Sequence, residues 1–147
     1  MDIVFHATRI TELAYLVAYL YLKPEVVDNL EQTLAEIALF RTAPLEKGTL
    51  YLLNQDRDHN RLFLLGRGKS KEIVIQALQG YSRIFGRKKG FIFFDLSQYE
   101  NSQIRYSQIL KALNLKQIAH FLMLQGIKKE LKKISYDLKA FRNTITG

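Results

Sequence analysis

Residues 126–147 read GIKKELKKISYDLKAFRNTITG and predict an amphipathic helix that organises the C-terminal half of the chain. Apolar side chains recur in it at alternating steps of four and three residues, namely Ile127, Leu131, Ile134, Leu138, Phe141 and Ile145. At roughly 100° per residue these positions form one stripe about 80° wide. The far side carries Lys128, Lys129, Lys132, Lys133 and Lys139. We therefore expect one face to be buried and the other, basic face to meet water or a polyanion.

A second apolar helix is predicted near the N-terminus, over residues 10–22 (ITELAYLVAYLYL). It is apolar on every side, so it must be buried inside the domain or against a partner. Pro24 suits the first position of a further helix that runs to about Phe40. The chain can also bind a protein partner or itself through one of two surfaces. The first is Tyr15 and Tyr19, because tyrosine is favoured at interfaces. The second is Leu131, Ile134 and Leu138, because the C-terminal apolar stripe is long. The three stripe positions are expected to be buried in either case.

The middle of the chain predicts a small mixed sheet. Residues 49–54 (TLYLLN) and 61–66 (RLFLLG) flank a polar turn and predict a β-hairpin with both strands buried on both faces. Residues 2–6 (DIVFH) predict a short edge strand. The turn contains Asp56, Asp58 and His59, a combination that indicates turn hydrogen bonding rather than a metal site.

The segment 66–72 (GRGKSKE) lies between a predicted strand and a predicted helix. Its glycines permit close approach of a ligand, Ser70 can cap the helix, and backbone N–H groups at a helix start bind anions. A nucleotide-binding P-loop would need a glycine where Phe63 stands, so no nucleotide hydrolase is predicted. The segment is either a loop that contacts phosphate or a plain turn between the strand and the helix, and both interpretations are kept. The candidate contacts are Arg67, Gly68, Lys69, Ser70 and Lys71.

Residues 71–85 predict a helix with Ile73, Ala77, Leu78 and Tyr81 inward, followed by a buried strand at 91–96 (FIFFDL). A strand, helix and strand of this length imply a parallel pair. Four basic residues surround the turn after the helix: Arg83, Arg87, Lys88 and Lys89. They lie near Tyr81 and Phe85, which either belong to the core or stack on unpaired bases.

Two more helices are predicted at 104–113 and 115–124, with a break around Asn114. The segments LKQIAHFL (115–122) and ISYDLKAFR (134–142) resemble the two helices of a helix-turn-helix domain, with Ala119 as the small residue of the first. The span from Ala119 to Ile134 is about five residues longer than a standard turn allows. Two packed helices or one long helix are the alternatives. His120 is expected to be a partly buried packing residue.

Charge is distributed unevenly along the 147 residues. Residues 1–65 carry six Lys or Arg and nine Asp or Glu, a net charge of −3, whereas residues 66–147 carry sixteen and five, a net charge of +11. Such asymmetry indicates binding to nucleic acid or to an anionic surface. There is no cysteine, no signal-peptide pattern, and no apolar run long enough to insert into a membrane. A cytoplasmic protein is expected.

The sequence as a whole predicts one α+β domain over residues 1–147: an acidic-leaning helical part (1–48), a middle part with three to four strands (49–96), and a basic helical part (97–147). No catalytic motif, cofactor or metal site is predicted. The predicted function is binding of DNA or RNA through phosphate contacts of the basic half. A small subunit of a nucleoprotein complex is one form of this function. The alternatives are an assembly subunit that docks through apolar helices, and a small enzyme or binder of phosphorylated ligands.

Overall fold

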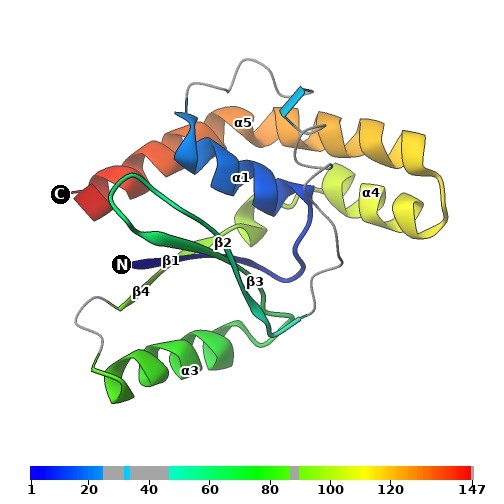
Figure 1. Ribbon diagram of the computed structural model, residues 1–147. Helices are drawn as coiled ribbons and strands as arrows, with labels where there is room; N and C mark the ends of the chain where they lie inside the picture. Colours follow the sequence, from blue (N-terminus) through cyan, green and yellow to red (C-terminus); the bar gives the residue numbers. More distant parts are fainter. Residues whose placement is uncertain (25–31, 34–46, 87–89, 147) are drawn as a thin grey trace. The chain divides into compact units, whose positions relative to one another are not determined.

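The computed structural model describes residues 1–24, 32–33, 47–86 and 90–146 (Figure 1). Its elements are β1 (Asp2–Ala7), α1 (Glu12–Leu22), β2 (Leu50–Gln55), β3 (Arg61–Gly66), α3 (Lys71–Ile84), β4 (Phe91–Asp95), the 3-10 turn η2 (Ser97–Tyr99), α4 (Ser102–Ala112) and α5 (Lys116–Thr146). The α+β class is confirmed. The helix predicted after Pro24 lies almost entirely outside the described residues.

The chain forms two compact units. Unit 1 comprises Met1–Ala18 and Leu34–Ser97, which include the sheet, the first part of α1, and α3. Unit 2 comprises Tyr19–Thr33 and Gln98–Gly147, which include the end of α1, α4 and α5.

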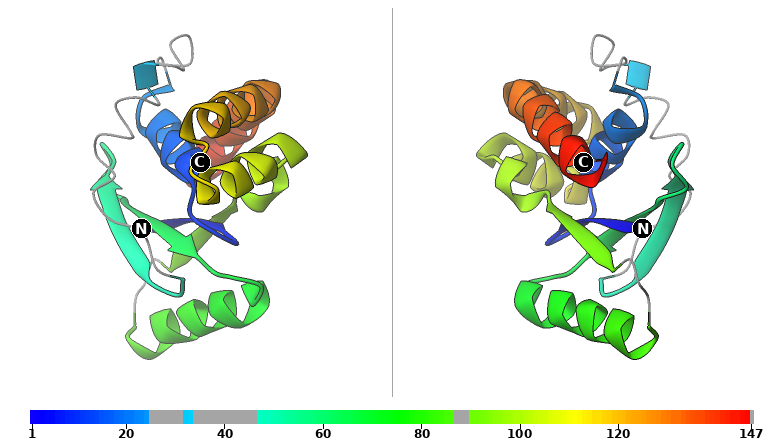
Figure 2. Two further views of the ribbon diagram at one scale, coloured as in Figure 1. Left: turned by 90° about the vertical axis from the view of Figure 1, so that its right-hand side faces the viewer. Right: turned by 90° about the vertical axis from the view of Figure 1, so that its left-hand side faces the viewer.

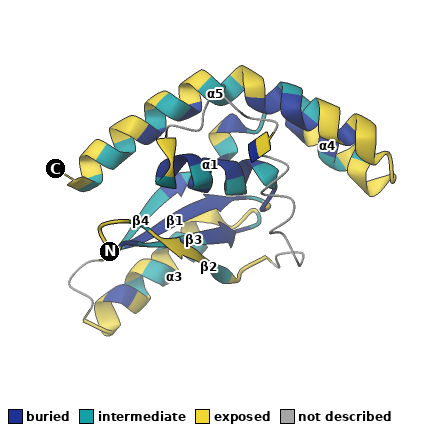
Figure 3. Cartoon of the chain, turned by 45° about the horizontal axis from the view of Figure 1, so that its top comes forward, coloured by how far each residue is buried: buried dark blue, intermediate teal, exposed yellow. Residues whose placement is uncertain are grey.

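The sheet of unit 1 has the strand order β2-β3-β1-β4. β1 pairs in parallel with both β3 and β4, and β2 pairs antiparallel with β3. The mixed sheet and the hairpin are thus confirmed. The edge position predicted for residues 2–6 is wrong, because β1 has a neighbour on each side and Ile3, Val4 and Phe5 are fully buried (Figure 3).

The two strands of the hairpin differ in burial. β3 is buried along most of its length, as predicted, but the burial predicted for β2 is wrong, since Leu52 is 61% exposed. The reason is topological: β2 ends the sheet and has one strand neighbour among the described residues. In the turn, the Asp56 carboxylate accepts hydrogen bonds from the backbone N–H groups of Asp58 and Asn60, at 2.9 and 2.8 Å.

The first part of α1 and the whole of α3 lie on opposite faces of the sheet (Figures 1 and 2). The predicted inward face of α3 is wrong at Ile73, Ala77 and Tyr81, which are exposed, Ile73 to 70% and Tyr81 to 46%, whereas Leu78 is half-buried. The buried position of this helix is Ser82, and a Cβ placed on Gly90 would meet its hydroxyl oxygen at 3.5 Å. Gly90, just before β4, therefore lies close to Ser82, which is on the opposite side of α3 from Ile73.

In unit 2, α4 and α5 form an antiparallel helical hairpin (Figure 1). The break predicted at Asn114 is confirmed: this residue has φ 61° and separates the two helices. At the other end of α4, the Asn101 side chain accepts the N–H of Ile104 at 3.1 Å, as an N-cap does, and donates to the Gly126 carbonyl at 2.9 Å. One side chain thus begins α4 and ties it to α5.

Helix α5 is continuous from Lys116 to Thr146. The helix-turn-helix arrangement is therefore wrong for these residues, and the alternative of one long helix is correct. The predicted apolar stripe is buried at Ile127, Ile134 and Leu138, while Leu131 is only half-buried. His120 is exposed, so its predicted packing role is also wrong.

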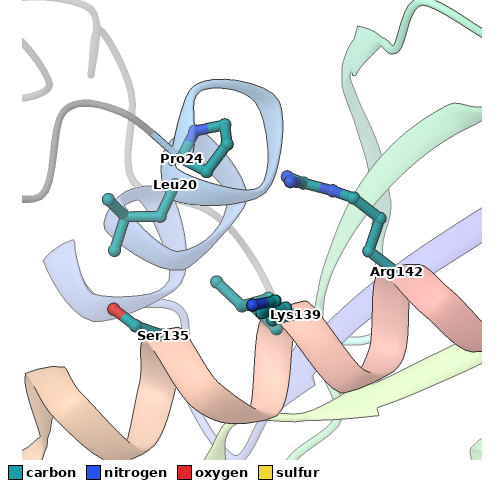
Figure 4. A pocket seen from close by; sticks show the side chains of 6 residues that line it. Leu20, Pro24, Ser135, Lys139 and Arg142 are labelled. Atoms are coloured by element: carbon teal, nitrogen blue, oxygen red, sulfur yellow. The ribbon is translucent and has the colours of Figure 1, made fainter.

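A pocket of about 330 Å³ opens in unit 2 between the end of α1 and α5 (Figure 4). It is lined by Leu20, Pro24, Ser135, Leu138, Lys139 and Arg142. Arg142 reaches from α5 to the end of α1, where its guanidinium donates to the Tyr21 carbonyl and lies 5.1 Å from the Tyr21 ring centroid. The C-terminal part of the apolar stripe, at Phe141, also packs edge-on against Tyr21. These contacts hold the last turns of α5 against residues 20–24.

Candidate functional site

The carboxyl ends of β1, β3 and β4 meet at one edge of the sheet, because the three strands are parallel. His6 stands opposite Leu65 of β3 on one side and Asp95 of β4 on the other. The loops that follow are joined by backbone hydrogen bonds: Arg67 donates to the Ala7 carbonyl at 2.9 Å and Gly68 to the Thr8 carbonyl at 3.1 Å. Residues far apart in sequence are thus brought together at this edge.

Arg67 is the centre of the side-chain cluster at this edge. Its side chain is 7% exposed. The guanidinium donates through Nε to Nδ1 of His6 at 3.0 Å, through one terminal nitrogen to the Gly68 carbonyl, and through the other to Ser97 Oγ at 3.1 Å and Asp95 Oδ1 at 3.5 Å. All three nitrogens of the guanidinium therefore donate to protein groups, and the side chain ties the ends of β1, β3 and β4 to one another.

Asp95 is the acidic member of the cluster. It accepts Lys71 Nζ at 2.5 Å, Ser97 Oγ at 2.6 Å and the Ser97 N–H at 2.9 Å. Partial burial acts to raise the pKa of Asp95, but the hydrogen bonds from Lys71 and Ser97 outweigh it and hold the pKa well below its usual range. The carboxylate therefore stays ionised and anchors the first residue of α3 to the end of β4.

His6 is held neutral beside these charges. Burial disfavours the imidazolium and lowers the pKa of His6 to about 4; Asp95 opposes this shift, and the positive charges of Arg67 and Lys71 add to it. Because Nδ1 accepts from Arg67, the proton of the neutral ring is on Nε2. His6 is thus a hydrogen-bond acceptor that orients Arg67, and its edge also packs against Phe93.

The loop proposed for phosphate contacts divides into inward and outward residues. Arg67 points into the cluster, whereas Lys69 is exposed and the Lys71 side chain is 46% exposed. Gly68 has φ 62°, a left-handed conformation that glycine adopts without strain. The cap predicted for Ser70 is wrong: Ser70 occupies the N-cap position of α3, but its side chain makes no capping hydrogen bond.

The basic face of α5 is a second candidate site, in unit 2. Lys128, Lys129, Lys132 and Lys133 are all exposed, as the periodicity predicted, and Lys139 is exposed on the same side. At about 100° per residue, these five lysines lie within an arc about 140° wide, opposite the buried stripe. The two carboxylates of α5, Glu130 and Asp137, fall outside that arc. Asp137 is engaged instead by the Tyr99 hydroxyl at 2.6 Å.

Tyr136 lies in the middle of this basic face and is 75% exposed. Sequence reasoning missed it, although its position was readable: it follows Lys132 by four residues and precedes Lys139 by three, so it shares their side of the helix. His6 and Ser97 were missed as well. Each stands at or just after the carboxyl end of a predicted strand, but strand order was needed to bring them together.

Of the four basic residues predicted around the end of α3, one lies within the described residues. Arg83 is exposed, and Arg87, Lys88 and Lys89 lie outside the described residues. Tyr81 and Phe85 do not belong to the core: they are 46% and 64% exposed, and their rings contact each other at 4.5 Å between centroids.

An apolar face covers the free end of the α4–α5 hairpin. Six large side chains on it are between 45% and 65% exposed: Tyr106, Ile109, Leu113, Leu115, Ile118 and Phe121. Residues 102–121 carry Arg105, Lys111 and Lys116 but no carboxylate. This face is distinct from the predicted partner surfaces, since Ile134 and Leu138 are buried and Tyr15, Tyr19 and Leu131 are half-buried.

The fold and the first site define an α+β protein with charged side chains gathered at the carboxyl edge of a mostly parallel sheet. Residues 2–143 match a family model, and the chain belongs to that family, described as "Protein of unknown function (DUF3189)". Searches of curated proteins and of solved structures found no match. Within the described part of the chain, no helix is long and apolar enough to cross a membrane, and no three His, Asp or Glu residues are grouped as metal ligands would be.

Proposed function

We propose that this protein binds nucleic acid through the basic face of α5. The observation that carries the proposal is the arc of five exposed lysines, 128, 129, 132, 133 and 139, with Tyr136 at its centre and no carboxylate within it. Lysines that neutralise phosphates release counterions, and this release drives binding without reading the base sequence.

The dimensions of the face fit a nucleic-acid backbone. Lys128 and Lys139 are eleven residues apart, about 16 Å along the helix axis, over which one duplex strand presents about five phosphates. An exposed tyrosine among lysines adds a surface on which an unpaired base can stack. We therefore favour single-stranded over duplex nucleic acid as the ligand. We also propose that the protein is located in the cytoplasm, where such ligands occur.

The test compares one neutralising substitution in two places. Binding of fluorescently labelled single-stranded RNA and DNA is measured by anisotropy for wild type, for Lys132→Gln, and for Arg57→Gln. Arg57 is an exposed cation in the β2–β3 turn of unit 1, so it controls for net charge. Lys132→Gln should weaken binding about equally for all sequences and reduce the slope of log K against log salt by about 0.7. Arg57→Gln should leave that slope unchanged.

Two results would overturn the proposal. Wild-type protein that binds neither RNA nor DNA at low salt would refute nucleic-acid binding itself. Equal losses for Lys132→Gln and Arg57→Gln would show that the interaction follows net charge and not the α5 face.

The exposed apolar face of the α4–α5 hairpin favours a second candidate function, that of an assembly subunit. Its cations Arg105, Lys111 and Lys116 would repel one another in a symmetric pair, so an acidic protein partner fits better than a second copy. This version expects a monomer by light scattering at all concentrations. A dimer that Leu113→Ser dissociates would contradict it, because the face would then pair with itself.

A further inference from the structure

In unit 1, the connections that follow two neighbouring strands leave toward opposite faces of the sheet at the Arg67 cluster. β1 and β3 are parallel neighbours, yet the helix after β1 begins on one face of the sheet and the helix after β3 lies on the other (Figures 1 and 2). In open α/β sheets, ligands bind outside the carboxyl ends of the strands where consecutive connections diverge in this way. This is the place that His6 and Arg67 occupy.

The loops at this edge are rich in cations. The segments 8–11, 47–49 and 67–70 carry Arg9, Lys47, Arg67 and Lys69 and contain no carboxylate, and Lys71 follows at the start of α3. Arg9, Lys47 and Lys69 are exposed, and none of them forms an ion pair with a described residue. A Cβ on Gly68 would lie 3.9 Å from Lys47 Cδ, so the Lys47 side chain runs along the 67–70 loop.

The carboxylates nearby leave a positive excess. Asp95 is shared by Arg67 and Lys71, and Glu12 and Glu72 stand in the first turns of α1 and α3. Among the described residues of the loops and the two helix starts, five cations therefore face three carboxylates. On α5 the lysines spread along one side of a helix, whereas here the cations come from the start of α3 and from three loops that backbone hydrogen bonds join together. Cations supplied by several segments at one sheet edge suit a small dianion better than a long polyanion.

We propose that this edge binds the phosphate group of a small phosphorylated molecule. Lys71 and the exposed Arg9, Lys47 and Lys69 supply the attraction. Arg67, His6 and Asp95 act as positioning residues: they hold the ends of the three strands together and fix Lys71 at 2.5 Å from Asp95. The exposed half of the Lys71 side chain leaves its ammonium able to donate to a ligand as well as to Asp95.

The experiment titrates 15N-labelled full-length protein with inorganic phosphate at pH 8, with chloride added to keep the ionic strength constant. Saturable shifts are expected in the amide signals of Thr8, Arg9, Gly68 and Lys69, and none in those of 128–139. Adenosine monophosphate and adenosine then separate the possible sources. An ester site binds the monophosphate more tightly than inorganic phosphate and does not respond to adenosine, whereas a site for free phosphate prefers the inorganic ion.

Two variants test the assignment of residues. Lys69→Gln removes an exposed cation with no hydrogen bond to a described residue, so it should weaken phosphate binding roughly tenfold without changing the melting temperature. Lys71→Gln should weaken binding at least as much, although it also removes the contact with Asp95. Arg57→Gln in the β2–β3 turn is the control and should bind phosphate like wild type.

The proposal is overturned if phosphate causes no saturable shift at this edge beyond that of chloride. It is also overturned if Lys69→Gln binds as wild type does, or if Arg57→Gln loses phosphate binding to the same extent. These outcomes are independent of nucleic-acid binding, because the proposed nucleic-acid face lies in unit 2 and is probed by a different variant.

Discussion

The Nε–H of Arg67 is donated to Nδ1 of His6 over 3.0 Å, although the two residues are 61 positions apart in the chain. This hydrogen bond requires His6 to be neutral, since an imidazolium would carry a proton on Nδ1. It therefore makes the carboxyl edge of the sheet sensitive to pH. Lys71 from α3 and Asp95 from β4 are the other charged groups that act on the ring.

The first prediction concerns stability in acid. The pKa of His6 falls from 6.5 to about 4 on folding, so the unfolded chain binds the extra proton first as the pH drops. The stabilisation from neutral His6 is complete above about pH 6.5 and is lost as the pH falls toward 4, with a slope of at most about 1.4 kcal/mol per pH unit. Urea unfolding between pH 4 and 8 measures this slope.

A matched pair of variants isolates His6 in that experiment. His6→Asn retains an acceptor for Arg67 but cannot be protonated, so it should flatten the dependence between pH 4 and 6.5. His120→Gln changes an exposed histidine on α5 and should leave the dependence as in wild type. If both variants show the wild-type slope, His6 is not the group that titrates.

The second prediction concerns the approach of α4 to α5. Gly126→Ala places a Cβ 2.7 Å from Ile104 Cγ1 and 2.9 Å from the capping oxygen of Asn101, so the helices must separate or the cap must move. We expect a loss of about 1–3 kcal/mol in the free energy of unfolding. Gly80→Ala on α3 is the control, because a Cβ there meets nothing within 4 Å.

The control should change stability in the opposite direction. Gly80 lies inside a helix, where alanine is more stable than glycine by roughly 0.5–1 kcal/mol. Equal effects of the two substitutions in thermal melts would mean that helix propensity, and not the contact with Asn101 and Ile104, decides the result at position 126.

The third prediction concerns the buried stripe of α5. Ile134 is fully buried, so Ile134→Ala should cost about 2–5 kcal/mol, whereas Leu131→Ala, at a half-buried position, should cost less. Chemical denaturation gives both values. If Leu131→Ala were the more damaging change, the helix would be rotated from the register described here.

The fourth prediction concerns Tyr136. If its ring stacks on unpaired bases, Tyr136→Ala should weaken binding of single-stranded RNA by about 1–3 kcal/mol, while Tyr136→Phe keeps most of the affinity. Neither should change the melting temperature much, because the side chain is 75% exposed. Fluorescence anisotropy with single-stranded and duplex oligonucleotides of equal charge provides the measurement. A loss of the same size on duplex would contradict stacking.

The sequence predicted well the features that depend on local spacing. The stripe Ile127–Ile134–Leu138 and the lysines opposite it follow from the helical repeat alone, since side chains three or four positions apart share a face. The β2–β3 hairpin and the break at Asn114 were also predicted from neighbouring residues. The inward face of α3 was predicted wrongly because this helix has apolar residues on more than one side; its buried position is Ser82, close to Gly90.

Strand order was decided only by the tertiary structure. The segment 2–6 is short and looked like an edge strand, but it pairs on both sides and becomes the centre of the sheet. That placement brings His6, Arg67 and Asp95 together, and it turns Arg67 from an expected surface contact into a buried positioning residue. The amphipathic helix was readable from the sequence because its pattern repeats within a few residues. The Arg67 cluster was not, because pairing between distant strands depends on long-range contacts that no local spacing encodes.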